Sequence, residues 1–91
     1  MNYQINKQKY CIRYIEDETI LLCFENGLSH KLDNIATIMF KLIEEFASDD
    51  KVFAELIKLF PDEDKNMLKN DYFGFVITLL NNEIVTIEAS N

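Results

Sequence analysis

The period of the hydrophobic pattern changes at Asp33, and this change restricts the fold more than any other feature of the sequence. Before Asp33, β-branched and aromatic residues form short stretches typical of strands, whereas apolar residues after it recur at helical spacing. Strands that all precede the helices indicate an α+β domain. A chain of 91 residues supports one small domain, which we place at residues 1–91 with its core over about residues 10–87.

Three short strands are expected before Asp33. Tyr10–Ile15 and Thr19–Phe24 are rich in β-branched and aromatic residues, and the acidic turn between them is short enough for a hairpin. Asn26-Gly27 predicts a two-residue type I′ turn, because that turn needs positive φ at both positions. The alternation in Leu28–Leu32 predicts a third strand, so this part of the chain should form a three-stranded antiparallel β-meander.

Three helices are expected after the meander, which gives the order β-β-β-α-α-α. Asp33 can cap the first helix and Asp50 the second, and Pro61 ends the second. A polar loop through Asp64 leads to the third helix, which Asn81-Asn82 ends. The apolar stripes are Ile35, Ile38, Met39, Leu42, Ile43 and Phe46 in the first helix, Val52, Phe53, Leu56, Leu59 and Phe60 in the second, and Leu68, Tyr72, Phe75, Val76 and Leu79 in the third.

The charge of the chain restricts its partners. Nine basic and sixteen acidic residues give a formal charge of −7, and the longest basic cluster is Lys7-Gln8-Lys9. Nucleic-acid and anionic-membrane binding both need clustered Lys and Arg, so we expect neither partner. The acidic balance favours a basic or neutral peptide, although solubility alone also explains it. Without an apolar segment at Met1–Lys9, and with two cysteines outside any CxxC pair, the chain is expected to be cytoplasmic.

Residues that could carry catalysis are few and scattered. His30 is the only histidine, and its alternation with apolar neighbours is typical of a half-buried, hydrogen-bonded strand residue. Cys11 and Cys23 lie on different predicted strands. A two-residue turn at Asp17-Glu18 would pair Ile12 with Cys23 and put the thiols on opposite faces, whereas a shift of one residue would put them on the same face. We therefore expect no enzyme activity, no metal and no cofactor.

Three segments in order carry a family resemblance. Leu32–Ile43 (Leu-Asp-Asn-Ile-Ala-Thr-Ile-Met-Phe-Lys-Leu-Ile) resembles the "Leu-Asn-x-Thr-Ala-x-x-Ile-Trp-x-Leu-Leu" opening helix of PqqD-like proteins, with Phe40 at the usual Trp. Asp50–Leu56 is similar to the second helix of that family, with Asp50 in place of its Gly. Asp71–Leu80 and the following Ile84-Val85 are similar to the family's third helix and its end, so the resemblance covers about residues 10–87.

The resemblance implies a winged-helix-like domain that recognises the leader of a ribosomally synthesised, post-translationally modified peptide precursor, a RiPP recognition element. The leader would add as a strand beside the third predicted strand, against the third helix. The free-standing domain would act as a peptide chaperone for a separate maturation enzyme, such as a radical SAM enzyme, a leader peptidase or a cyclase of a lasso-peptide or PQQ-type pathway. A winged-helix DNA-binding or regulatory domain and a dimeric scaffold protein are the alternatives.

The physical features of these segments give the expected binding residues. An uncovered edge at the third strand could pair with a peptide, and one flank of the third helix could form the wall. Gly74 on that flank would allow close backbone approach or serve tight helix packing, and Asp71 would accept from the leader or make a structural hydrogen bond. The predicted peptide-binding residues are Leu28, Ser29, His30, Lys31, Leu32, Met67, Asp71, Gly74, Phe75 and Thr78.

The Asn26-Gly27 turn would align Cys23 with His30 and so assign the two faces of the sheet. One face, expected to be the core, carries Tyr10, Ile12, Tyr14, Leu21, Cys23, Leu28 and Leu32. The other face carries Ile15, Ile20, Leu22 and Phe24, a patch expected to dock the modifying enzyme or to form a homodimer. Alternatively, Ile84–Ile87, which should form a small closing strand or a packed tail, covers that patch.

Overall fold

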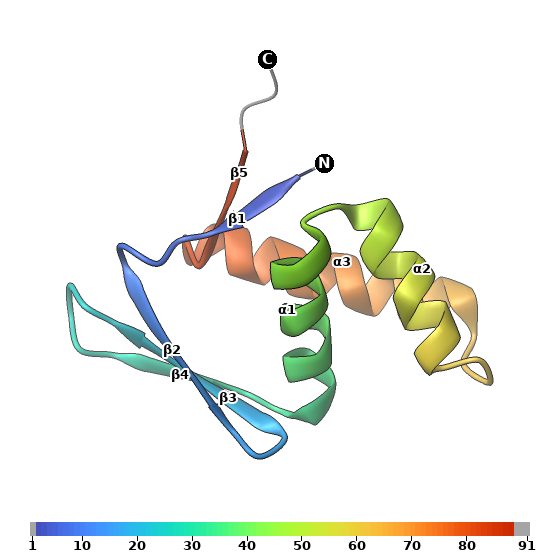
Figure 1. Cartoon of the computed structure of the whole chain (residues 1–91), viewed down its shortest axis with the longest axis horizontal. Coiled ribbons are helices and arrows are strands. Elements are labelled where there is room, and N and C mark those ends of the chain that lie inside the picture. The colour runs from blue at the N-terminus through green and yellow to red at the C-terminus, as the bar shows by residue number, and fades with distance from the viewer. Residues whose placement is uncertain (1, 89–91) are drawn as a thin grey trace.

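The computed structural model describes residues 2–88 and confirms an α+β domain with a three-stranded meander followed by three helices (Figure 1). Helix α1 stands between the meander and α2, and α3 runs behind α1 (Figure 1). Within residues 2–88, no helix is both long and apolar enough to cross a membrane. The elements are β1 Tyr3–Ile5, β2 Tyr10–Ile15, β3 Glu18–Cys23, β4 Ser29–Leu32, α1 Asn34–Phe46, α2 Asp49–Leu59, α3 Lys65–Asn81 and β5 Val85–Ile87.

The first and last strands form a small sheet of their own. The expected closing strand is present as β5, and it pairs antiparallel with β1, a strand that was not predicted. Tyr3 lies opposite Ile87, and Ile5 lies opposite Val85. Ile84 and Val85 are buried in the core, so the tail packs there and does not cover the outer face of the meander.

The first hairpin has a different register from the predicted one. Ile15 pairs with Glu18, so the turn is at Glu16–Asp17, where Glu16 has φ 55°. Tyr10, rather than Ile12, therefore lies opposite Cys23. A displacement of two residues leaves every side chain on its expected face. Accordingly Cys23 is buried and Cys11 is partly exposed on the other face, and both are free thiols.

The second connection is not the predicted two-residue type I′ turn. Residues 24–27 separate Cys23 from Leu28, and of Asn26 and Gly27 only Gly27 has positive φ, at 70°. The Asn26 side chain instead accepts a hydrogen bond from the Leu28 N–H at 2.9 Å. As a result Leu21, not Cys23, lies opposite His30.

Two residues expected in the core are outside it. Leu28 belongs to the connection before β4 and is 64% exposed. Tyr14, near the end of β2, is 39% exposed; its hydroxyl donates to Glu44 of α1, and its ring lies under the Lys41 ammonium of the same helix. The other inward-facing residues of the meander pack on the helices, and they are Tyr10, Ile12, Leu21, Cys23 and Leu32.

The starts of the helices follow their capping residues. Asp33 Oδ1 accepts from the Ala36 N–H at 2.8 Å, and Asp64 caps α3 in the same way through Asn66 and Met67. The predicted cap Asp50 is wrong: α2 begins at Asp49, after Ser48. Ala47 adopts a left-handed φ of 59°, which ends α1, and α2 starts two residues earlier than a cap at Asp50 predicts.

Two polar contacts fix the helices within the core. The buried hydroxyls of Thr19 and Thr37 are 2.7 Å apart and join β3 to α1. The Asp49 carboxylate accepts from the Tyr72 hydroxyl at 2.7 Å and from the Tyr3 hydroxyl at 3.1 Å. Burial, together with Asp49, raises the pKa of both phenols above the usual value of 10.0, so both remain donors at neutral pH. Asp49 therefore joins β1, α2 and α3 and sets the position of α3.

Candidate functional site

Strand β4 is an edge of the meander, because in residues 2–88 it pairs with β3 and no other strand. The Cys23 N–H donates to the Leu28 carbonyl at 2.9 Å, so Cys23 and Leu28 form a hydrogen-bonded pair of the β3–β4 ladder. In antiparallel pairing, hydrogen-bonded and non-hydrogen-bonded positions alternate. Ser29 and Lys31 therefore direct their backbone N–H and C=O groups away from β3, toward the open side.

A groove of about 500 Å³ lies on that open side, between β4 and the C-terminal half of α3. Its walls come from both elements, together with the start of α1 and the residue before β5. Of the predicted binding residues, six line this groove. The complete lining is Ser29, His30, Lys31, Leu32, Asp33, Ala36, Phe75, Thr78, Leu79, Asn82 and Ile84.

The exposed residues of the groove lining are polar, whereas its buried and half-buried residues are mostly apolar. His30 and Leu32 lie on the inner face of the sheet, opposite buried Leu21 and Thr19, and are themselves half-buried. The His30 ring is half-buried as expected, but its contact is with the Tyr10 ring, 6.1 Å away between centroids, and not a side-chain hydrogen bond. Half-buried Phe75 faces them from α3. The groove can therefore take apolar side chains from a strand placed along β4.

Gly74 lies on the same flank of α3 and is exposed, outside the groove lining. A Cβ built at Gly74 would meet no heavy atom within 4 Å, so the tight-packing explanation for this glycine is wrong. Its carbonyl accepts a hydrogen bond from the Thr78 hydroxyl at 3.1 Å. The surface of α3 beside the groove is therefore open to close approach of another chain.

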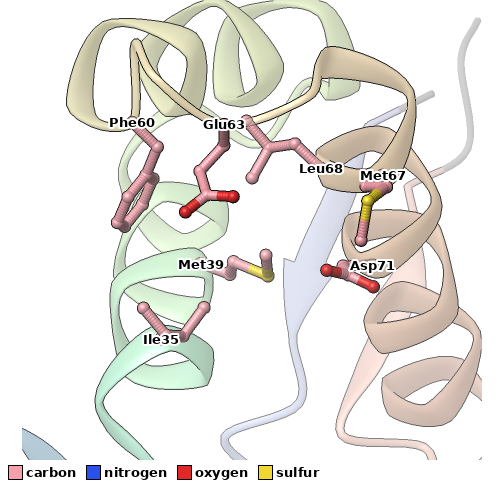
Figure 2. Close-up of a pocket in the computed structure, with 7 residues that line it drawn as sticks. All are labelled: Ile35, Met39, Phe60, Glu63, Met67, Leu68 and Asp71. Atoms are coloured by element: carbon pink, nitrogen blue, oxygen red, sulfur yellow. The ribbon is translucent and has the colours of Figure 1, made fainter.

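Met67 and Asp71 are not part of the groove. They line a separate pocket between α1 and the N-terminal half of α3 (Figure 2). The helix rises about 1.5 Å per residue, so Met67 and Thr78 share a flank but lie about 16 Å apart along the axis. The pocket is lined by Ile35, Met39, Phe60, Glu63, Met67, Leu68 and Asp71.

The outer face of the meander carries the predicted apolar patch. Ile15, Leu22 and Phe24 are 56%, 40% and 61% exposed, and Ile20 between them is half-buried. Because β5 pairs with β1, the patch has no cover in residues 2–88. In the same residues, no three His, Cys, Asp or Glu side chains are close enough to hold a metal ion.

Sequence reasoning missed five of the eleven residues that line the groove. Asp33 was predicted as a helix cap and Leu79 as core, and both have these roles as well. Ala36, Asn82 and Ile84 gave no signal for a place in a binding site, because each reaches the groove only through the packing of α1 and the end of α3 around β4. The Tyr10 hydroxyl donates to the Asn82 carbonyl at 2.8 Å and holds that end of α3 against the sheet.

An edge-exposed meander with a groove against its last helix defines a winged-helix-like α+β domain. Among solved structures, the fold is similar to that of TbiB1 in complex with the TbiA(beta) leader peptide. The TM-score is 0.82 at 22% sequence identity, and the match covers 96% of this chain and 99% of that chain. No protein-family model matches the sequence, and no curated protein matches it. The comparison shows the fold, which is the one that the PqqD-like resemblance implies.

Proposed function

We propose that this chain binds the leader of a ribosomally synthesised, post-translationally modified peptide precursor as an added strand along β4, against α3. The observation that carries the proposal is the open edge of β4 facing the groove. Ser29 and Lys31 offer two N–H and two C=O groups there, and an extended peptide can satisfy all of them. The structure of TbiB1, which has the same fold, contains a leader peptide, and this supports the proposal.

The pairing pattern determines which leader side chains are recognised. An antiparallel strand would exchange hydrogen bonds with Ser29 and Lys31, and its side chains at those positions would lie on the outer face of the sheet. The residues opposite His30 and Leu32 would point into the groove toward Phe75. We therefore expect two apolar leader residues separated by one position.

The backbone hydrogen bonds alone do not supply the free energy that binding needs, so these two side chains must contribute. About four backbone hydrogen bonds contribute roughly 0.5–1.5 kcal/mol net each. A micromolar complex needs about 8 kcal/mol after the entropy of association is offset. Each apolar side chain that becomes fully buried contributes about 1.5–3 kcal/mol. The backbone would therefore set the direction of the leader, and the groove would select its sequence.

The wider role follows from the binding function. The chain would present the leader to a separate maturation enzyme, such as a radical SAM enzyme, a leader peptidase or a cyclase, and would act in the cytoplasm as a peptide chaperone rather than a catalyst. No observation favours the DNA-binding alternative. On α3, the basic residues are Lys65 and Lys69, and the chain carries a charge of −7.

The direct test is an NMR titration of ¹⁵N-labelled protein with the leader of any short peptide precursor that is found encoded near its gene. We expect the largest shift changes at Ser29–Leu32 and Phe75–Thr78, with new protection of the Ser29 and Lys31 amides from hydrogen exchange. The TbiA(beta) leader serves as a comparison peptide for selectivity. Saturable binding whose shift changes avoid both β4 and α3 would overturn the assignment of the groove.

Replacing the exposed glycine of α3 is expected to raise the stability of the free protein and to lower its affinity for the leader. Gly74→Ala should stabilise the free protein by about 0.5–1 kcal/mol, because alanine is the better helix former and its methyl meets no neighbour. The same methyl should weaken leader binding by severalfold if the peptide backbone passes close to this turn of α3. Urea unfolding and fluorescence anisotropy measure the two effects. A stabilised variant with unchanged affinity would place the leader away from Gly74.

We also propose that Ile15, Ile20, Leu22 and Phe24 form the surface that contacts the maturation enzyme or a second copy of the chain. Leu22→Asp puts a charge at the centre of this patch without touching the core, since the side chain is 40% exposed. It should leave leader affinity unchanged and abolish co-purification with the enzyme or, if the chain is a homodimer, convert it to a monomer. Unchanged behaviour in both pull-down and sedimentation experiments would exclude the patch as an interface.

A further inference from the structure

The pocket at the N-terminal half of α3 is small, and its lining combines apolar side chains with two carboxylates (Figure 2). Its apolar wall includes Ile35, Met39 and Met67, of which Ile35 is 45% and Met67 64% exposed. The volume is about 190 Å³. Small-molecule and cofactor sites usually have roughly 300–1,000 Å³. The pocket is therefore of a size to take one side chain rather than a whole ligand.

Two carboxylates give this pocket its charge. Glu63, from the connection between α2 and α3, and Asp71, from α3, point into the space between α1 and α3 (Figure 2). Neither has an ion-pair partner among the described residues, and no Lys or Arg lines the pocket. A cation placed between them would gain two favourable interactions without displacing an existing one.

The pocket and the groove lie on the same helices. Ile35 in the pocket directly precedes Ala36 in the groove, and Asp71 is one helical turn before Phe75. An antiparallel leader runs opposite to β4, so its N-terminal end leaves the groove at Leu32, where the chain enters α1. The leader residues that precede the added strand are therefore the ones that come next to the pocket.

We propose that this pocket is a second subsite for the leader, which takes an apolar side chain adjacent to a Lys or Arg on the N-terminal side of the added strand. The inference rests on the proposed function, and it specifies the chemistry of the leader. An apolar residue beside a Lys or Arg would come first, and the strand with its two apolar residues would follow. The apolar wall holds the side chain, and Glu63 with Asp71 selects the neighbouring cation.

The test begins with a randomised peptide library displayed on phage and selected on the wild-type protein. Enriched peptides should carry two apolar residues separated by one position, preceded by an apolar residue beside Lys or Arg. Peptides that bind along β4, as NMR shift changes at Ser29–Leu32 report, but show no enrichment of basic residues before the strand would overturn the subsite and leave the proposed function intact. Enrichment of no peptide that contacts β4 would overturn the proposed function itself.

Variants in which amides replace the two carboxylates then test these carboxylates directly. Glu63→Gln with Asp71→Asn should weaken the selected peptides by about three- to tenfold and reduce the salt dependence of binding. Glu45→Gln with Glu88→Gln changes the net charge equally at exposed positions outside the pocket and should have no such effect. A peptide in which Lys or Arg is replaced by norleucine should bind the wild type and the pocket variant equally. Equal weakening by both double variants would assign the effect to overall charge and overturn the subsite.

Discussion

Replacing Lys31 with proline is expected to weaken leader binding by about 100-fold while the domain remains folded. Lys31 directs its N–H away from β3, so proline removes a donor from the open edge and not from the existing ladder. The proline ring also occupies the space that the backbone of the added strand needs. Isothermal titration calorimetry with the leader measures the loss, and circular dichroism with thermal unfolding checks the fold.

The opposite edge of the meander provides the matched control. The Phe24 N–H donates to the Lys9 carbonyl, which sets the phase of the β2–β3 ladder and turns the N–H of Tyr14 outward. Tyr14→Pro therefore introduces the same change at the other open edge and should leave leader affinity within about twofold of the wild type. If both variants bind the leader normally, strand addition to the meander is excluded. If only Tyr14→Pro loses binding, the leader pairs with β2.

Filling the groove from the helix side is expected to lower affinity by about 10- to 100-fold. Thr78 is exposed and lines the groove, so Thr78→Trp places an indole where the leader side chains would pack. Loss of one or both of those side chains from the groove removes about 1.5–3 kcal/mol each. The stability of the free protein should change by no more than about 0.5 kcal/mol, because the position is on the surface. Anisotropy titration and urea unfolding measure the two quantities.

Ile77→Trp is the control for this substitution. Ile77 is 56% exposed on α3 and lies outside the groove and the pocket. The same indole at this position should leave leader affinity unchanged. Comparable losses in both variants would show that bulk anywhere on α3, rather than occupation of the groove, disturbs binding. A normal affinity of Thr78→Trp would exclude α3 as the wall of the site.

Local sequence signals predicted the type of most elements but not their pairing. The change of period at Asp33 marks the boundary between sheet and helices, and Asp33 caps α1 as predicted. Asp64, predicted to lie in the loop before the third helix, caps α3. Hydrophobic alternation indicates the face on which a strand residue lies. It cannot distinguish two pairing registers that differ by two residues, because both keep every side chain on the same face. Both hairpins differ from prediction by two residues, because Glu16 and residues 24–27 form connections that their composition did not reveal.

The candidate site shows the same division between local and long-range information. Helical periodicity correctly grouped Met67, Asp71 and Thr78 on one flank of α3. It could not show that α1 crosses in front of that flank and divides it into a pocket and a groove. That division depends on where Asp49 and the Tyr10 hydroxyl hold α3, and both contacts join residues far apart in the sequence.

The pairing of Tyr3 with Ile87 determines when the domain can become functional during synthesis. The meander consists of neighbouring hairpins and can form early, whereas the pairing of β1 with β5 joins residues far apart in the sequence and carries a larger loop-closure entropy. Asn82 and Ile84, which close the groove, also come from this late segment. A nascent chain whose residues after Asn81 are still in the ribosomal tunnel would therefore expose the β4 edge without the completed groove, so selective capture of a leader would begin only after Asn82, Ile84 and β5 have left the tunnel.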